Sequence, residues 1–179
     1  MQVMRKLALV LENLCRDYNS KSFLPILEAD VAAYMYHLWV SQFGEAANLH
    51  LETRIYQKSD CKFDFVVGKI DYDTAKPCII KPELVAELKS FPYGFTCQQH
   101  RVHYFHVLDD DLPKLQSVKD PQENRYEILF DEDDYLKGYD NNSNSTRIER
   151  LNKLRDELDQ KISLVYLRKM AKGLEYKLI

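Results

Sequence analysis

The chain has 179 residues, of which 45% are hydrophobic and 30% charged, so it is long enough to bury a sizeable hydrophobic core. Glycine and proline are scarce, which excludes fibrous and low-complexity proteins. The formal net charge of −3 argues against a protein that coats nucleic acid without specificity, although it allows a local basic groove around an acidic site.

The apolar segments are short and the cysteines are not paired in a metal-binding or redox motif. No apolar stretch approaches the length needed to cross a membrane. The four cysteines contain no C-x-x-C pair, and no signal peptide is evident at the start of the chain. We therefore expect a cytoplasmic protein with reduced thiols, no lipid anchor and no membrane partner.

Two helices are predicted first along the chain. Leucine and valine residues at helical spacing predict a helix over residues 2–16. Pro25 is expected to be the first residue of a second helix, because the missing N–H of proline is tolerated at that position. This second helix is expected to end near Gly44.

Three strands are predicted next, because β-branched and aromatic residues are frequent in three short segments separated by polar turns. The segments are residues 49–57, 63–70 and 79–88. The third strand is expected to be interrupted near Pro82, since proline cannot donate a ladder hydrogen bond.

Helices and strands alternate in the rest of the chain. The expected elements are a helix over 94–108 with a further turn through 115, a strand over 126–130, an exposed acidic loop over 131–145, an amphipathic helix over 147–160, a strand over 162–167 and a basic tail from Arg168. This order predicts one α/β domain over residues 1–179, with a central mixed β-sheet flanked by helices in three layers.

A carboxylate and a lysine are expected side by side on the third strand. Glu87 and Lys89 are two positions apart, so they project from the same face of that strand. Leu84, Ala86 and Leu88 then project from the other face and are predicted to belong to the core.

A second carboxylate, Asp64, lies in the preceding strand, where Phe63 and Phe65 are expected to take the opposite face. If the two strands pair, Asp64 lies beside Glu87. Two close carboxylates repel each other, and a hard divalent cation such as Mg²⁺ or Mn²⁺ removes that cost. A lysine beside them, Lys89, can position or deprotonate a water molecule. The three residues therefore predict the metal site of an enzyme that cleaves phosphodiester bonds.

Asp64 followed by Glu87-Leu88-Lys89 resembles the D…(D/E)-x-K signature of the restriction-endonuclease-like PD-(D/E)xK nuclease superfamily. The element order from about residue 25 to residue 131 is similar to the core of that family, with the helix 2–16 and the helix and strand 147–168 as extensions. Phe63 stands where the family pattern has proline.

The resemblance implies a restriction-endonuclease-like three-layer fold and a Mg²⁺- or Mn²⁺-dependent endonuclease, with DNA favoured over RNA as substrate. Asp64 and Glu87 would bind the metal and Lys89 would assist the attacking water. Family members often carry a further acid in the helix before the first strand, for which Glu28 is the candidate, with Asp30 close behind. Acids in a first helical turn also favour the helix dipole without any catalytic role.

Other supporting residues are open to more than one interpretation. Gln98 or Gln99 corresponds to a glutamine that some family members carry in the helix after the lysine strand. Glu52 is either a further acid at the site or an ion-pair partner of Arg54 on the same strand face.

Candidates for contact with a phosphate backbone are Lys81, Arg101, Arg147 and Arg150, although ion pairs within the helix 147–160 are a simpler role for the last two. Three histidines at positions 100, 103 and 106 are expected to form a solvated face or to contact phosphate, rather than to bind zinc.

Two further hypotheses remain open at this point. The chain is alternatively a catalytically inactive binding module with this fold, such as a subunit of a larger nucleic-acid-processing or defence complex, or the charged triplet is only a ladder of ion pairs. A homodimer is expected if both strands of a duplex are cut.

Overall fold

The computed structural model describes residues 2–56, 60–73, 79–119, 121, 123–140 and 144–179. Its centre is one six-stranded sheet in the order β1-β2-β3-β4-β7-β8. The strands are β1 (Leu49–Arg54), β2 (Lys62–Ile70), β3 (Ile80–Phe91), β4 (Arg125–Asp131), β7 (Ile162–Met170) and β8 (Gly173–Leu178).

Strand directions are mixed. β2 is antiparallel to both of its neighbours, β1 and β3. β3, β4 and β7 are parallel, and β8 returns antiparallel to β7. The predicted α/β class with a central mixed sheet is therefore confirmed. A small separate hairpin pairs β5 (Tyr139–Asp140) with β6 (Ser145–Thr146).

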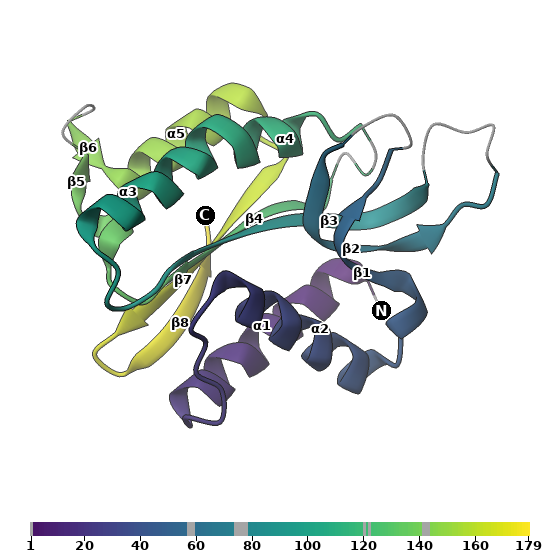
Figure 1. Cartoon of the computed structure of the whole chain (residues 1–179), viewed down its shortest axis with the longest axis horizontal. Coiled ribbons are helices and arrows are strands. Elements are labelled where there is room, and N and C mark those ends of the chain that lie inside the picture. Colours follow the sequence, from purple (N-terminus) through teal and green to yellow (C-terminus); the bar gives the residue numbers. More distant parts are fainter. Residues whose placement is uncertain (1, 57–59, 74–78, 120, 122, 141–143) are drawn as a thin grey trace.

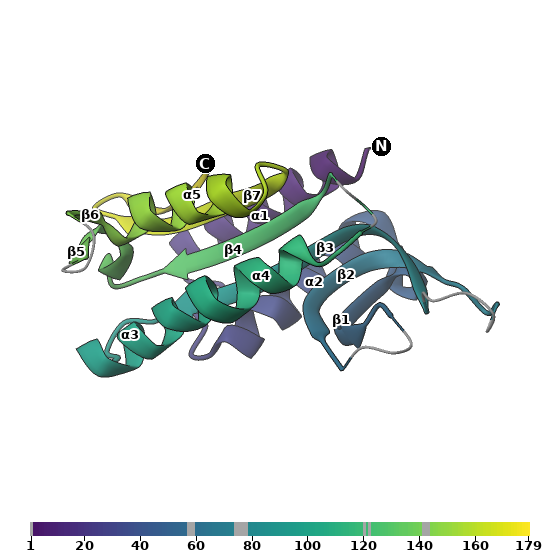
Figure 2. The same cartoon turned by 90° about the horizontal axis from the view of Figure 1, so that it is seen from above.

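Helices cover both faces of the sheet, as Figures 1 and 2 show. One face carries the first two helices and the other face carries the last three. The helices are α1 (Val3–Asn19), α2 (Glu28–Phe43), α3 (Cys97–His106), α4 (Leu112–Gln116) and α5 (Arg147–Leu158), with short 3₁₀ helices η1 (Ala46–Asn48) and η3 (Tyr135–Lys137). A π-helical turn, η2 (Val107–Asp111), joins α3 to α4. No helix in these described segments has the length and apolar character needed to span a bilayer.

Each face of the sheet has its own hydrophobic core. Leu84, Ala86 and Leu88 of β3 belong to the core under α1 and α2, as predicted, whereas Val85 belongs to the core under α3, α4 and α5. The alternation places Glu87 and Lys89 on the α3 and α4 side, where they contact residues of α4 and η2. Leu174, near the start of β8, packs in the same core as α1 and α2.

The prediction that the second helix begins at Pro25 is wrong, because it begins at Glu28. Asp30 accepts hydrogen bonds from the N–H groups of Ile26 and Leu27, at 2.9 and 2.8 Å. These bonds hold the preceding residues in a turn outside the helix. The predicted helix 94–108 likewise begins later, at Cys97, where Thr96 caps it.

Pro82 does not interrupt the third strand, contrary to expectation. β3 runs continuously from Ile80 to Phe91, but its pairing with β2 is irregular beside Pro82. Val67 pairs with Leu84 and Gly68 pairs with Pro82, so Glu83 is an extra residue in β3. A bulge at Glu83 of β3 thus accompanies the missing N–H of proline.

The C-terminal half is more ordered than predicted. The segment 131–145 contains η3 and the β5–β6 hairpin, so the prediction of a plain loop is wrong. The final strand extends to Met170 and pairs with β8, so the residues predicted as a basic tail form a hairpin. β1 ends at Arg54, earlier than predicted, and Gln57 lies outside the described residues.

Candidate functional site

Strands β2 and β3 separate next to Asp64 and leave backbone groups of β3 without a strand partner. The ladder between them reaches Phe65 and Ala86, whereas β3 stays paired with β4 as far as Phe91. Two carboxylates satisfy the N–H groups beyond this fork. Asp64 Oδ2 accepts from Leu88 N–H at 2.7 Å, and Glu28 Oε2 accepts from Ser90 N–H at 3.0 Å. The fork therefore fixes a carboxylate of β2 and one of α2 along the same edge of β3.

Lys89 lies between two acids. Its Nζ is 3.4 Å from Glu28 Oε1 and 3.5 Å from Asp111 Oδ2. Burial alone would lower the pKa of Lys89, but Asp111 and Glu28 more than compensate and raise it above its ordinary value. The lysine is therefore a fixed cation, suited to orienting a water or stabilising a phosphate rather than to accepting a proton.

Glu28, Asp64 and Lys89 share one hollow of about 350 Å³, which lies between α2 and α3 at the end of the fork. Glu52 of β1 also lines it, with a backbone φ of 47°. The hollow therefore brings together four of the residues predicted for the site.

The predicted faces of the two phenylalanines in β2 are wrong. Phe63 and Phe65 do not share a face, because Phe63 packs in the core under α3 to α5 and Phe65 in the core under α1 and α2. Glu52 is not paired with Arg54, whose guanidinium lies 3.0 Å from Asp60.

Glu87 lies beside this hollow but does not line it. Only 2% of the residue is exposed, and its Oε2 is 2.7 Å from Lys114 Nζ of α4. Burial, followed by the charge of Asp64, raises the pKa of Glu87 to about 9, although Lys114 acts in the opposite direction. Its Oε1 is buried with no hydrogen-bond partner among the described residues.

Glu127 of β4 is a further buried acid. It is directly opposite Glu87 in the parallel ladder and is 0% exposed. Neither carboxylate oxygen has a hydrogen-bond partner within the described segments. Burial raises its pKa well above the ordinary value, and the charges of Asp111 and Glu87 raise it further.

The chemistry of these donors suits a hard divalent cation, because Asp64, Glu87 and Glu28 offer carboxylate oxygens and Glu87 Oε1 is unsatisfied. Within the part of the chain that the structure describes, however, no three acidic, histidine or cysteine side chains are already arranged to hold a metal ion. Lys114 currently supplies the positive charge beside Glu87. An ion shared by Asp64 and Glu87 would therefore take over the charge compensation that Lys114 provides.

Two of the predicted supporting residues, Asp30 and Gln99, have structural contacts elsewhere. Asp30 caps the turn before α2, and the side chain of Gln99 accepts from the Thr96 N–H at 2.8 Å and caps α3. Gln98 is exposed, and neither glutamine lines the hollow. Lys81 is exposed near the other end of β3, beside Lys69.

The three arginines predicted to contact phosphate also lie outside this hollow. Arg101 and Arg147 line a second hollow on the other side of α3. Arg150 is ion-paired with Asp140 at 2.6 Å.

The sequence analysis missed Asp111, Lys114 and Glu127. Glu127 gave a usable signal, since it is a charged residue inside the apolar strand predicted over residues 126–130. Asp111 and Lys114 gave no such signal in the sequence, because the π-helical turn η2 that precedes α4 sets which way these side chains face.

The prediction of a solvated histidine face is wrong for His100. This side chain is buried, lies 3.1 Å from Asp133 Oδ2 and stacks on Tyr135 with ring centroids 4.8 Å apart. His103 lines the hollow of the candidate site, and its Nδ1 is 2.8 Å from the Ser90 carbonyl oxygen.

Comparison with known proteins gives little to build on. No family model matches the chain, and no curated protein matches its sequence. Among solved structures it is similar to SfsA of Pyrococcus furiosus in complex with Ca²⁺, with 12% identity and a TM-score of 0.29. The match covers 82% of this chain and 62% of the SfsA chain, so this chain spans less than two thirds of that protein. Similarity at this level is too low to support an argument about function, which must therefore come from the site.

Proposed function

We propose that this chain is a divalent-metal-dependent nuclease of the PD-(D/E)xK type that hydrolyses phosphodiester bonds, with DNA favoured over RNA. The observation that carries the proposal is the hollow at the β2–β3 fork, where Glu28, Asp64 and Lys89 meet. Glu87 lies next to it and is close enough to Asp64 for the two charges to interact.

Each residue has a role in this proposal. Asp64 and Glu87 hold Mg²⁺ or Mn²⁺, and Glu28 supports the ion from the first turn of α2. When bound, the ion supplies an activated water and polarises a phosphoryl oxygen. Lys89, held by Glu28 and Asp111, orients the attacking water and stabilises negative charge on the phosphate. A nucleic-acid partner and a cytoplasmic location belong to the same proposal.

The direct test is cleavage of single- and double-stranded DNA and of RNA in Mg²⁺ or Mn²⁺. Lys89→Ala is expected to lower the rate by about 100-fold or more, since it removes the fixed cation. Lys69→Ala is the matched control, because it removes an exposed lysine near the far end of β2. Equal rates for the wild type and Lys89→Ala would refute the assignment.

One observation favours a second candidate, a nucleic-acid-binding module without catalysis. Lys114 Nζ already lies 2.7 Å from Glu87 and offsets part of the cost of its charge without a metal ion. Calorimetric titration with Mn²⁺ distinguishes the two, since the module predicts nucleic-acid binding with no saturable metal site. Sedimentation with and without DNA tests the further expectation of a homodimer.

A further inference from the structure

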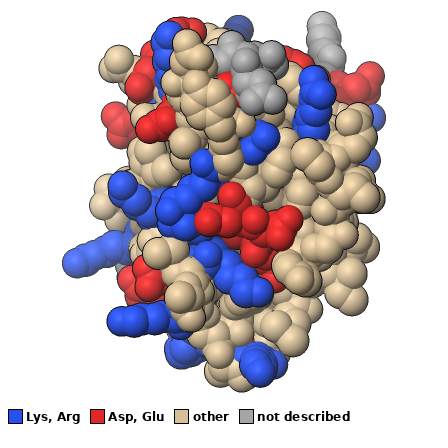
Figure 3. Space-filling model, turned by 90° about the vertical axis from the view of Figure 1, so that its left-hand side faces the viewer, with Lys and Arg blue, Asp and Glu red and all other residues tan. Residues whose placement is uncertain are grey.

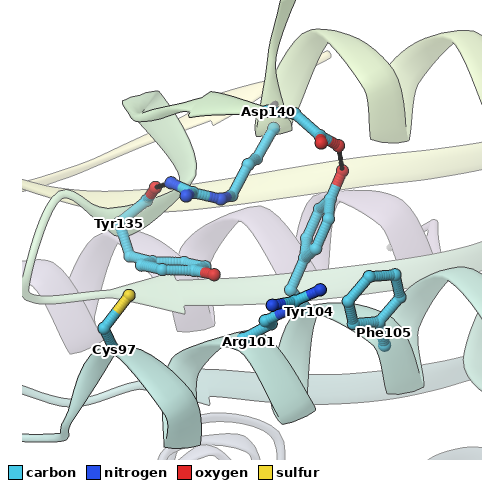
Figure 4. Close-up of a pocket in the computed structure, with 7 residues that line it drawn as sticks. Cys97, Arg101, Tyr104, Phe105, Tyr135 and Asp140 are labelled. Carbon is cyan, nitrogen blue, oxygen red and sulfur yellow. Dashed lines mark hydrogen bonds between the residues drawn. The ribbon is translucent and has the colours of Figure 1, made fainter. Parts of the chain in front are cut away.

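A second hollow of about 260 Å³ lies on the other side of α3 from the candidate nuclease site. Its walls come from α3, η3, β5 and the first residue of α5, and Figure 4 shows several of the side chains that line it. Arg101 of α3 and Arg147 of α5 both line it, so two separate elements each contribute an arginine to the same space.

Local contacts hold Arg147 in place. Its guanidinium carbon is 4.0 Å from the centroid of the Tyr135 ring, and its Nη1 donates to the Tyr135 carbonyl oxygen at 2.9 Å. Arg101 is less constrained and lies over the Phe105 ring at 5.5 Å. Stacking leaves the edges of both guanidinium groups available for hydrogen bonding in the plane.

These two arginines differ from most others in the chain. Ion pairs with carboxylates engage Arg16, Arg54, Arg125, Arg150, Arg155 and Arg168. Across the described residues, neither Arg101 nor Arg147 has such a pair.

Asp140, the acid at the edge of the hollow, is already engaged. Its Oδ2 is 2.6 Å from Arg150 and accepts from the Tyr104 hydroxyl at 2.9 Å. Arg150 therefore balances the charge of Asp140, and the hollow keeps the positive charges of Arg101 and Arg147.

We propose that this hollow binds a phosphate monoester group. Such a group carries nearly two negative charges and several acceptor oxygens, which match two guanidinium groups that are not paired with protein carboxylates. The Tyr135 hydroxyl faces the same space and can donate a further hydrogen bond (Figure 4). The source is either the terminal phosphate of a nucleic-acid strand or a free phosphate compound. The inference does not depend on cleavage at the other site.

The test is calorimetry in EDTA with inorganic phosphate and with one oligonucleotide carrying either a 5′-phosphate or a 5′-hydroxyl. The wild type is expected to bind phosphate, and Arg101→Gln is expected to weaken this binding at least fivefold. Arg5→Gln is the matched control, because it removes an exposed arginine of α1 outside the hollow. Tighter binding of the 5′-phosphorylated strand identifies a strand end as the source, and equal binding of both strands identifies a free phosphate compound.

A second measurement uses Cys97, a free and exposed thiol that lines the same hollow. Phosphate is expected to slow the alkylation of Cys97 in the wild type but not in Arg101→Gln. Peptide mass spectrometry measures the rate of this alkylation. If the wild type shows neither binding nor protection, or if Arg101→Gln behaves like the wild type, the proposal is overturned. Neither measurement uses a divalent metal ion. A negative result in them is therefore independent of the outcome of the nuclease assay.

Discussion

Burial and neighbouring charges act against each other on the groups of the candidate site. Asp111 and Glu28 keep Lys89 charged, whereas burial favours the protonated forms of Glu87 and Glu127. Deprotonation of Glu87 is therefore costly even beside Lys114, and a bound metal ion would offset that cost.

The buried carboxyl of Glu127 predicts a pH-dependent loss of stability. Its pKa is raised on folding, so the folded protein retains the proton to a higher pH than the unfolded chain does. The free energy of unfolding should then fall as pH rises above about 4.5, the ordinary value. Glu127→Gln carries no charge and should be more stable than the wild type at pH 8, by about 2 kcal/mol, with little difference at pH 4.

Urea denaturation in EDTA at several pH values measures this difference. Glu83→Gln is the control, because Glu83 is exposed on the adjacent strand β3. Parallel stability curves for the wild type and Glu127→Gln would show that Glu127 does not hold a proton in the folded state. The free energy of unfolding should fall less steeply with pH in Glu127→Gln than in the wild type. The pH dependence should not vanish, since the pKa values of Glu87 and Asp111 are also raised.

Among the elements, α3 depends on its N-terminal cap. Thr96 and Gln99 form a reciprocal capping box, in which the Gln99 N–H donates to the Thr96 hydroxyl at 3.3 Å. Thr96→Ala should lower the free energy of unfolding by about 1 kcal/mol. Gln99→Ala should also destabilise the protein while leaving nuclease activity unchanged, because Gln99 does not line the hollow. Gln98→Ala, an exposed neighbour, should change neither quantity, and a selective loss of activity in Gln99→Ala would restore the catalytic role implied by family resemblance.

The close approach of β2 to β3 beside the Glu83 bulge depends on the small size of Gly68. A Cβ atom there would lie 2.5 Å from the Lys81 carbonyl oxygen and 2.7 Å from Pro82 Cα, both of them backbone atoms. Gly68→Ala should therefore cost about 2 kcal/mol or more in thermal or urea unfolding, because the two strands must move apart. A fully stable Gly68→Ala protein would show that the pairing of β2 with β3 tolerates a wider spacing.

Element type was easier to predict than element ends. Periodic apolar residues located most of the helices and sheet strands, and the face alternation of β3 was predicted correctly. The errors came from side-chain bonds and pairing partners that periodicity does not report. Asp30 delays the start of α2, and a bulge at Glu83 accompanies the continuation of β3 past Pro82. β8 was missed because its pairing with β7 and its packing against α1 are tertiary effects.

At the scale of the whole molecule, the formal net charge says little about where charge is concentrated. Figure 3 shows one side of the molecule, on which acidic side chains gather in the middle and basic side chains lie to their left and below them. Because such fields are local, the net charge of −3 is compatible with binding of an anionic ligand.

Part of the site was predicted from the sequence, but the residues around it were not. Glu28, Asp64 and Lys89 were placed in one region by strand alternation and by family resemblance, and they do share a hollow. The contact between Glu87 and Lys114 could not be predicted, because the position of Lys114 follows from the π-helical turn before α4. Such contacts between distant elements cannot be derived from spacing along one strand.

The most direct test of the account is whether Asp64 and Glu87 bind a metal ion. Calorimetric titration of Mn²⁺ at pH 8 should show saturable binding to the wild type and none to Asp64→Asn. Asp109→Asn, which changes an exposed acid of η2, should bind as the wild type does. Absence of saturable binding to the wild type, or equal binding to Asp64→Asn, would contradict the account.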